Sequence, residues 1–400
     1  MARTHHVTLP KGFTAAGVKC GIKTSVREDL ALIVADEPAS AALMTTSNQV
    51  VGAPVLWCRR VLPRGYGKIR GIVVNSGNSN VCTGRQGLRD AGAMAAEAAD
   101  LVGAEAGEML VASTGIIGHF LPMAKIRHGI ALAAKALGRR NDRAALRAIM
   151  TTDTCEKSAV AQARIGGQEV TVAGIVKGAG MIAPSLATMI AVVTTDADIA
   201  PPLLRRAFVP AVEASLNAVT VDSDQSTSDT AVVMASGKAG RRIPAASADY
   251  RKFAAALAEV LTALAMAMAR DGEGATRLIQ VSVAGARTDA EAKIAAMSVA
   301  DSPLVKTAVH GGDPNWGRIV MALGKSAAKV VPQKLSVKIG GTVVFARGRP
   351  RPFNVKAVEK HLAGDPVVIE ATLGLGAGRF TAYTCDLSRE YITINADYHT

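Results

Sequence analysis

Aromatic residues make up only 4% of this 400-residue chain. That share is too small for a nucleic-acid stacking surface or a carbohydrate-binding platform. Cysteine is also scarce. The five cysteines lie far apart without C-x-x-C spacing, which excludes a disulfide framework and a zinc site and fits a reducing compartment. We expect all five to be small buried residues: Cys20, Cys58, Cys82, Cys155 and Cys385.

The chain also lacks a long apolar run. The longest stretch, Met181 to Val193, is interrupted by Pro184 and is too short to span a bilayer. The first residues, MARTHHVTLPKGFTAAG, contain no apolar core of a signal peptide. We therefore expect a soluble, cytoplasmic protein with no membrane partner.

Motifs for nucleotides and metals are absent as well. Gly312 to Arg318 has Arg where a P-loop has Lys, and Gly374 to Gly378 lacks the dinucleotide-binding spacing. The acidic run Asp222 to Thr230 lacks the Gly and the final Glu of an EF-hand, and we favour a structural, hydrogen-bonded loop there. His310 and the other six histidines form no metal pattern, so we expect no cofactor and no metal.

Positive charge is plentiful, with a formal net charge of +13 and an isoelectric point near 9.7. The Lys and Arg residues are nevertheless scattered, and runs such as Arg347 to Arg351 are short. This distribution favours a solvated basic surface over a nucleic-acid site. The positive field would favour substrates that carry carboxylates or phosphates.

Hydrophobic residues form 49% of the chain, enough for a large core and for two or more packed subdomains. Strand-like and helix-like patterns recur in both halves, which predicts a layered α/β or α+β fold. Two amphipathic helices, expected at 90–102 and 123–137, flank a turn-like segment, Ser113 to Gly118. The expected strands are 30–34, 50–51, 69–74, 169–176 and 188–194, with a strand-like tail at 334–394, and the expected helices are 90–102, 123–137, 203–217, 250–269 and 289–299.

Chemistry is indicated by the segment Lys177 to Val193, in which glycines, a proline and the small residue Ala187 precede Thr188. A strained turn before Thr suits attack of its hydroxyl on the preceding carbonyl. Cleavage would free an α-amine with an ordinary pKa of about 8, which can serve as the base for that hydroxyl. On the local pattern alone, the simpler interpretation is a Gly-Pro loop before a buried strand containing Thr188.

The run KGAGMIAPSLATMIAVVTTDA closely resembles the autocleavage segment of the ornithine acetyltransferase / glutamate N-acetyltransferase family of arginine biosynthesis. Ser79, Ser223 and Gln225 depart from the family pattern, and none of them adjoins the nucleophile. The resemblance covers nearly the whole chain through motifs in a shared order: NSGNSNVCTG (75–84), STGIIG (113–118), TTDT (151–154), VDSDQSTSDT (221–230), ARDGEGATR (269–277), DPNWGR (313–318) and the C-terminal CDLSREYITINADYHT.

The resemblance implies an α/β fold of layered sheets and helices, of the self-cleaving N-terminal-threonine acyltransferase type. Cleavage between Ala187 and Thr188 would give an alpha chain, 1–187, and a beta chain, 188–400, that begins with the nucleophile. Thr114 and Gly115 would form the oxyanion hole, although Ser-Thr-Gly alone indicates a cap or turn. The implied substrate contacts are Thr154, Lys177, Thr188, Glu273, Asn395 and Thr400.

By the same resemblance, Thr188 takes an acetyl group from N-acetylornithine and passes it to glutamate in a ping-pong reaction. Acetyl-CoA would be a further donor in the bifunctional branch, and two alpha and two beta chains would form a heterotetramer. Taken alone, Lys177 or Glu273 would be a solvated surface charge. Two alternatives stay open: a hydrolase or aminopeptidase in which water resolves the acyl-enzyme, and a non-catalytic binding protein.

Overall fold

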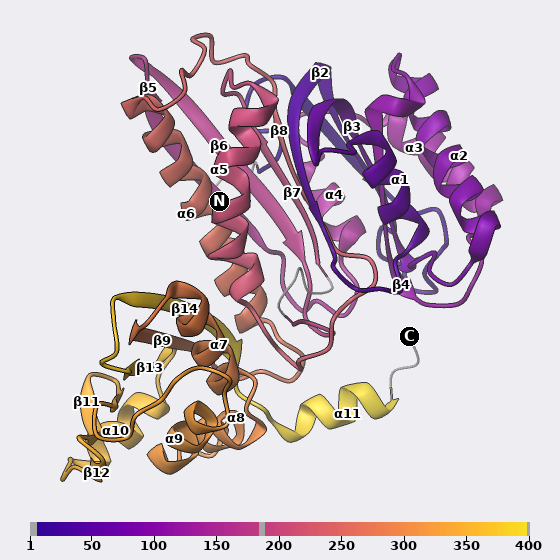
Figure 1. The fold of residues 1–400 in the computed structure, drawn as a ribbon. Coiled ribbons are helices and arrows are strands. Elements are labelled where there is room, and N and C mark those ends of the chain that lie inside the picture. Colours follow the sequence, from indigo (N-terminus) through magenta and orange to yellow (C-terminus); the bar gives the residue numbers. More distant parts are fainter. Residues whose placement is uncertain (1–5, 184–188, 398–400) are drawn as a thin grey trace.

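The computed structural model describes residues 6–183 and 189–397. They form two lobes, each built on one β-sheet with helices packed against it (Figure 1). The last helix, α11 (Arg389–Asp397), leaves the second lobe and extends beneath the first (Figure 1). The predicted α/β fold of layered sheets and helices is confirmed.

The first lobe contains an eight-stranded sheet with the order β4-β3-β2-β8-β7-β6-β5, and β1 pairs with β2. Neighbours are antiparallel except for the parallel pairs β3–β4 and β7–β8. The strands are β1 (Phe13–Val18), β2 (Leu30–Thr45), β3 (Tyr66–Asn78), β4 (Met109–Ile116), β5 (Ser158–Ile165), β6 (Gln168–Lys177), β7 (Ile190–Thr195) and β8 (Thr230–Ala235).

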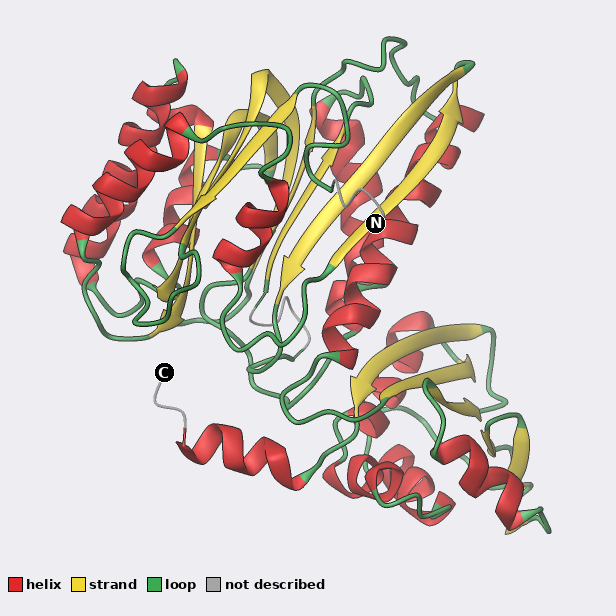
Figure 2. Ribbon diagram, turned by 180° about the vertical axis from the view of Figure 1, so that it is seen from behind, coloured by secondary structure: helices red, strands yellow, loops and turns green. Residues whose placement is uncertain are grey.

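Helices cover both faces of this sheet, which is why its central strands are apolar almost throughout. In β2, Leu32 packs with α2 and α3, whereas the next residue, Ile33, points to the opposite face and packs with α4. Helices α5 and α6 cover β5 to β8 on the outside (Figure 2). The helices are α1 (Ala53–Val61), α2 (Gly84–Val102), α3 (Met123–Lys135), α4 (Asp142–Ile149), α5 (Pro201–Glu213) and α6 (Ala248–Arg270).

Helix α6 is long and apolar enough to cross a membrane by length and composition, with a mean hydropathy of 1.6. Half of that apolar window is buried inside the fold. Its buried face, which includes Leu257 and Leu264, packs in the core shared with β6 and β7. A core helix of a soluble protein passes the same test, so α6 is explained by its packing.

The second lobe has a six-stranded sheet with the order β12-β11-β10-β13-β9-β14 and its own buried core. Side-chain caps begin several of its helices, since Thr288, Ser302 and Asn354 each accept a backbone N–H three residues later. The elements are β9 (Leu278–Ala286), α7 (Asp289–Ala300), α8 (Pro303–His310), α9 (Trp316–Gly324), β10 (Ser336–Ile339), β11 (Thr342–Ala346), β12 (Arg349–Pro350), α10 (Val355–Leu362), β13 (Val367–Thr372) and β14 (Gly378–Cys385).

Most of the predicted elements are present, and three predictions of secondary structure are wrong. Residues 50–51 lie in the loop before α1, Ser113 to Ile116 belong to β4 instead of a turn, and the tail contains α10 and α11 as well as strands. The prediction that all five cysteines are buried is also wrong, because Cys82 and Cys155 are exposed and Cys20 is half-buried. The errors at 50–51 and 113–116 share one cause: the local pattern does not report tertiary pairing, which decides whether a short β-prone or Gly-containing run joins a sheet.

The predicted cleavage point, Ala187–Thr188, lies outside the described residues, in the connection between β6 and β7. These two strands are hydrogen-bonded neighbours, with Lys177 opposite Ile190. Strand β8 in turn pairs with β2. The segments before 184 and after 188 therefore share one sheet, so a break in the connection would leave both segments bound to each other.

Candidate active site

Thr114 and Gly115 stand at the carboxyl end of β4, opposite Ser76 and Gly77 of β3. Gly115 has φ +125°, a backbone conformation that residues with a Cβ rarely adopt. A Cβ at this position would lie 2.4 Å from the carbonyl carbon of Gly77. The glycine is therefore required by the close approach of β3 and β4, and this approach fixes the direction of the neighbouring Thr114 side chain.

Polar side chains from the NSGNSN motif hold this strand end on both sides. The Ser113 hydroxyl donates to Asn75 Oδ1 at 2.6 Å, and Ser79 Oγ donates to the carbonyl oxygen of Ile116 at 2.7 Å. Asn75 is fully buried and also donates to the Asn78 carbonyl. These contacts show that the NSGNSN motif supports the strand end that carries Thr114.

Lys177 ends β6 and is brought to Thr114, with its Nζ 3.3 Å from Thr114 Oγ1. Four strands separate β4 from β6 in the sheet order, so the sheet must curl strongly for these two ends to meet. Lys177 is 2% exposed. Burial lowers the pKa of its ammonium below the ordinary value, although the Asp153 carboxylate acts in the opposite direction. The solvated-surface interpretation of Lys177 is therefore wrong.

Thr154 is exposed and lies beside a buried ion-pair network. Its backbone N–H donates to Asp271 Oδ2 at 3.1 Å, and its hydroxyl donates to Asp271 Oδ1. Lys157 Nζ lies 2.6 Å from Asp153 Oδ1 and also bonds Asp271. Asp153 Oδ1 accepts a further bond, from the Gly178 N–H next to Lys177. The network thus joins the segments of two predicted substrate contacts, Thr154 and Lys177, and no sequence motif indicated it.

Charge compensation within this network is strong. Burial alone would raise the pKa of Asp153, but the ammonium groups of Lys157 and Lys177 lower it to about 2. Burial likewise disfavours the charged form of Lys157, yet Asp153 and Asp271 raise the pKa of Lys157 above its ordinary value. Since the pKa of Asp153 is lowered, its stabilisation is present above the ordinary value of 3.8 and is lost as the pH falls toward about 2.

Replacement of Lys157 by Met should destabilise the fold by about 3–5 kcal/mol, because it leaves two buried carboxylates without their shared cation. Chemical denaturation at neutral pH measures this change. Glu156→Gln is the control: Glu156 pairs with Arg143 and Arg147 at the surface, so its loss should cost less than about 1 kcal/mol. Equal stabilities of the two variants would show that Lys157 does not support the fold.

Glu273 and Asn395 are brought together, with Asn395 Nδ2 donating to Glu273 Oε2 at 2.9 Å. The Glu273 N–H donates to Ala179 O, and the Glu273 carboxylate lies against Gly180, where a Cβ would come within 2.4 Å of it. Glu273 is only 9% exposed, so it is not the solvated surface charge that its sequence alone suggests. The β6–β7 connection and the loop after α6 thus lie in direct contact.

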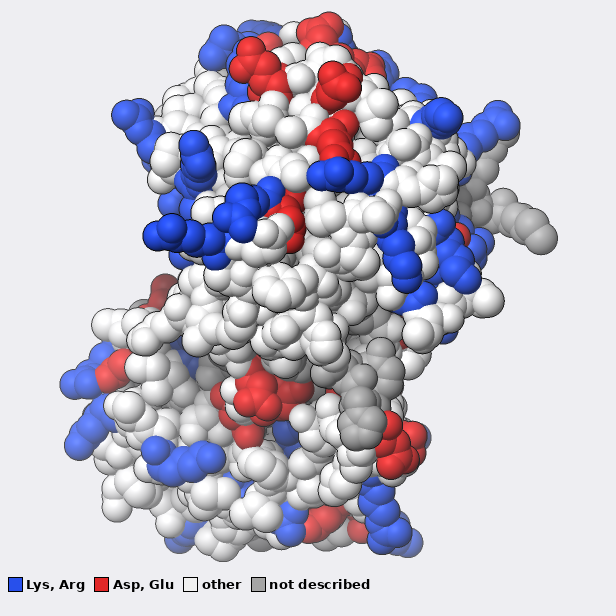
Figure 3. All heavy atoms as spheres, turned by 90° about the vertical axis from the view of Figure 1, so that its right-hand side faces the viewer, with Lys and Arg blue, Asp and Glu red and all other residues white. Residues whose placement is uncertain are grey.

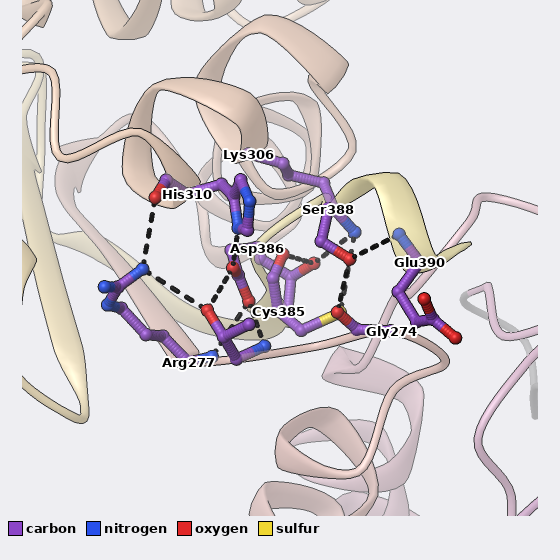
Figure 4. Close-up of polar contacts among 10 residues, drawn as sticks. Gly274, Arg277, Lys306, His310, Cys385, Asp386, Ser388 and Glu390 are labelled. Atoms are coloured by element: carbon purple, nitrogen blue, oxygen red, sulfur yellow. Dashed lines mark hydrogen bonds and ion pairs between the residues drawn. The ribbon is translucent and has the colours of Figure 1, made fainter. Parts of the chain in front are cut away.

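The loop after α6 is also tied to the chain that leads into α11 (Figure 4). Asp386 accepts bonds from both the N–H and the hydroxyl of Thr276, and lies 2.7 Å from His310 Nδ1. Ser388 Oγ donates to the Gly274 carbonyl at 2.6 Å. These contacts hold α11, and hence Asn395, beside Glu273, and they give the His310 imidazole a carboxylate partner.

The run Asp222 to Thr230 forms the structural, hydrogen-bonded loop that the sequence predicted. Asp222 accepts the N–H groups of Met181 and Ile182. Asp229, which is fully buried, accepts the N–H of Met189 at 3.0 Å, and burial raises the pKa of Asp229 well above its usual range. The sequence did not identify Asp229. It fixes the first described residue after the predicted nucleophile.

Three predicted site residues, Ala187, Thr188 and Thr400, lie outside the described residues. Within 6–183 and 189–397, no group of three or more His, Cys, Asp or Glu side chains could hold a metal ion. Figure 3 shows Lys and Arg side chains spread over the face it displays, as expected for a solvated basic surface. The described part of the site thus offers the hydroxyls of Thr114 and Thr154, one glycine N–H, two lysines and several carboxylates.

Hydroxyl and backbone N–H donors are the groups that stabilise an oxyanion in acyl transfer, so these residues are compatible with an acyltransferase. Comparison with known proteins agrees: the sequence model of the ArgJ family matches residues 14–400. The chain belongs to the ArgJ family. It is therefore an acyltransferase of arginine biosynthesis, as the motif resemblance predicted.

Two relatives called "arginine biosynthesis bifunctional protein ArgJ" are similar over nearly their whole lengths. The protein from Chlorobaculum tepidum is 44% identical, with 98% of this chain and 97% of that protein covered. The one from Symbiobacterium thermophilum is 46% identical, with 98% of each covered. A solved ArgJ chain from Bacillus halodurans is 41% identical, with a TM-score of 0.51, 52% of this chain covered and 98% of that chain.

Proposed function

We propose that this enzyme moves an acetyl group from N2-acetylornithine to the amine of glutamate through an acetyl-Thr188 intermediate. The observation that carries the proposal is the contact between Thr114 Oγ1 and Lys177 Nζ. These residues come from β4 and β6, which are separated by four strands in the sheet. Acetylation of Thr188 releases ornithine, and attack by the glutamate amine on the ester regenerates the free hydroxyl. The two half-reactions form a ping-pong cycle.

The contacts of Thr114 suit it to an oxyanion hole. A hydroxyl has one hydrogen and two lone pairs. Because Thr114 Oγ1 accepts a bond from Lys177, its hydrogen is available for the oxygen that becomes negative in the tetrahedral intermediate. The Gly115 N–H would be the second donor. The same two donors would serve acylation and deacylation.

Lys177 and Glu273 give the site charges of both signs for an amino-acid substrate. We assign the Lys177 ammonium to the substrate carboxylate, and Glu273, with Asn395 beside it, to a substrate ammonium. Thr154 and Thr400 complete the proposed contacts. No bound cofactor is needed. The word "bifunctional" in the names of the relatives supports acetyl-CoA as an additional donor substrate.

We further propose maturation into chains 1–187 and 188–400 that assemble as a heterotetramer of two alpha and two beta chains in the cytoplasm. The shared sheet supports lasting association, because β7 and β8 lie between β6 and β2. The solved Bacillus halodurans chain is almost fully covered by only 52% of this one, so it is about half as long. A half-length family chain fits cleavage near the middle.

Lys177→Met should weaken use of N-acetylornithine without weakening the fold. We expect its KM to rise about tenfold to a hundredfold, the loss of one charge-assisted contact. Asp153 keeps Lys157 as its partner, and burial of the Lys177 ammonium is itself unfavourable, so the melting temperature should stay equal or rise.

The control for this change is Lys238→Met, which removes an exposed lysine paired with Glu37. Both variants are compared by steady-state kinetics and thermal unfolding. Wild-type kinetic constants in Lys177→Met would refute the assignment of Lys177 to substrate.

One assay separates the proposal from its two rivals. The purified protein is incubated with N-acetylornithine and isotopically labelled glutamate, and ornithine, labelled N-acetylglutamate and free acetate are quantified. Ornithine and N-acetylglutamate in equal amounts are expected. Ornithine with free acetate would mean a hydrolase, and binding without any product would mean a non-catalytic protein; either result would overturn the proposal.

A further inference from the structure

One buried ammonium group holds together the segments that carry three predicted substrate contacts. Lys157, the residue before β5, bonds Asp153 in the loop after α4 and Asp271, the C-cap residue of α6. Asp153 in turn bonds the N–H of Gly178, the residue after Lys177. The side chains of Lys157 and Asp153 are fully buried, and that of Asp271 is 4% exposed. Their placement is therefore fixed by the core.

The two oxygens of Asp271 have different partners. Oδ1 accepts the hydroxyl hydrogen of Thr154, whereas Oδ2 accepts the Thr154 N–H and the Lys157 ammonium. A threonine hydroxyl has a single hydrogen and two lone pairs. Once that hydrogen is bonded to Asp271, the hydroxyl can meet a ligand only as a hydrogen-bond acceptor. Thr154 is exposed, so its lone pairs are accessible to a small molecule.

We propose that Asp271 is a positioning residue that makes the Thr154 hydroxyl an acceptor for an N–H group of the amino-acid substrate. This inference rests on the proposed function and adds which partner donates the hydrogen in the contact between Thr154 and the substrate. Lys157 stabilises the Asp271 carboxylate. A carboxylate at the C-terminus of a helix such as α6 is disfavoured by the helix dipole, and the Lys157 ammonium offsets that effect.

The chemistry of the reaction agrees with this polarity. N-acetylornithine and glutamate both carry N–H groups, and the acetyl group moves from one nitrogen to the other. A donor at Thr154 would instead favour a carboxylate or carbonyl oxygen, a role that the Lys177 ammonium already suits. An acceptor at Thr154 therefore selects the orientation in which the substrate nitrogen, not its carboxylate, faces the 151–154 loop.

Asp271→Asn inverts the polarity with little change of shape. The amide oxygen should occupy the Oδ2 position, because Lys157 and the Thr154 N–H both need an acceptor there. The amide nitrogen then lies at the Oδ1 position and donates to Thr154 Oγ1. The Thr154 hydroxyl loses a free lone pair and points its hydrogen outward. We expect KM for N-acetylornithine to rise about tenfold, with kcat within about threefold of wild type.

A double-mutant cycle tests whether Asp271 acts through Thr154. Thr154→Val alone should raise KM about tenfold, and Asp271→Asn in that background should add nothing. Thr154→Ser keeps the hydroxyl and should have a near-wild-type KM. Glu156→Gln, which removes a carboxylate from the same segment, should leave the kinetic constants unchanged. If KM of the double variant instead rises about a hundredfold, the product of the two single effects, the inference is overturned. Asp271 would then act independently of Thr154, as a merely structural residue does.

The outcomes remain distinguishable if a variant or the proposed function fails. Absence of acetyl transfer by the wild-type enzyme would refute the proposed function before any variant is compared. If Asp271→Asn does not fold, Thr154→Val and Thr154→Ser still decide the matter, because an unchanged KM in Thr154→Val would overturn the acceptor role. An unchanged KM in a folded Asp271→Asn would do the same.

Discussion

Thr188→Ala should remain a single 41.2 kDa chain and should transfer no acetyl group. The uncut precursor has a hydroxyl at Thr188 but no free α-amine there to act as its base. Attack of that hydroxyl on the Ala187 carbonyl moves the acyl group from nitrogen to oxygen, and hydrolysis of the ester then releases the amine. Alanine lacks the attacking oxygen, so both maturation and acetyl transfer should be lost.

Mass spectrometry and N-terminal sequencing measure this outcome directly. Wild-type protein should give fragments of about 19 and 22 kDa that co-purify, since strands from both segments share one sheet. Thr188→Ser is the matched control: it retains a hydroxyl and should still cleave. A wild-type preparation that transfers acetyl groups while intact would contradict the mechanism, and a cleaved Thr188→Ala would show that the hydroxyl is not the attacking group.

Much of the scaffold could be predicted from periodicity because its elements are long and regular. The pattern at 250–269 lies within α6, and that at 169–176 lies within β6. The end of β4 could not be predicted in this way. Ser113 to Gly115 have the composition of a turn, and they join the sheet only because Asn75 and Gly77 of the distant β3 accommodate them.

The candidate site residues were predicted from the motif resemblance, but their burial and their charge partners were not. A lysine at the end of a strand is ordinarily exposed, and nothing within 177–193 indicates that the sheet curls until Lys177 reaches Thr114. The contact between Thr154 and Asp271 joins residues 117 positions apart. Each motif shows which residues accompany one another in the chain, whereas charge compensation between motifs depends on the folded arrangement.

Thr114→Ala should lower kcat for acetyl transfer by about 10²–10³, the range for loss of one oxyanion-hole donor. The Gly115 N–H remains, so activity should fall without being abolished. The fold should persist because Ser113 and the pairing of β4 with β3 are untouched.

Since the Thr114 hydroxyl can also assist self-cleavage, the variant's chains are first checked by mass and only the cleaved fraction is assayed. Thr114→Ser, which keeps the donor, should retain most of the wild-type kcat. An unchanged kcat in fully cleaved Thr114→Ala would assign the oxyanion to other groups and leave Thr114 only as a partner of Lys177.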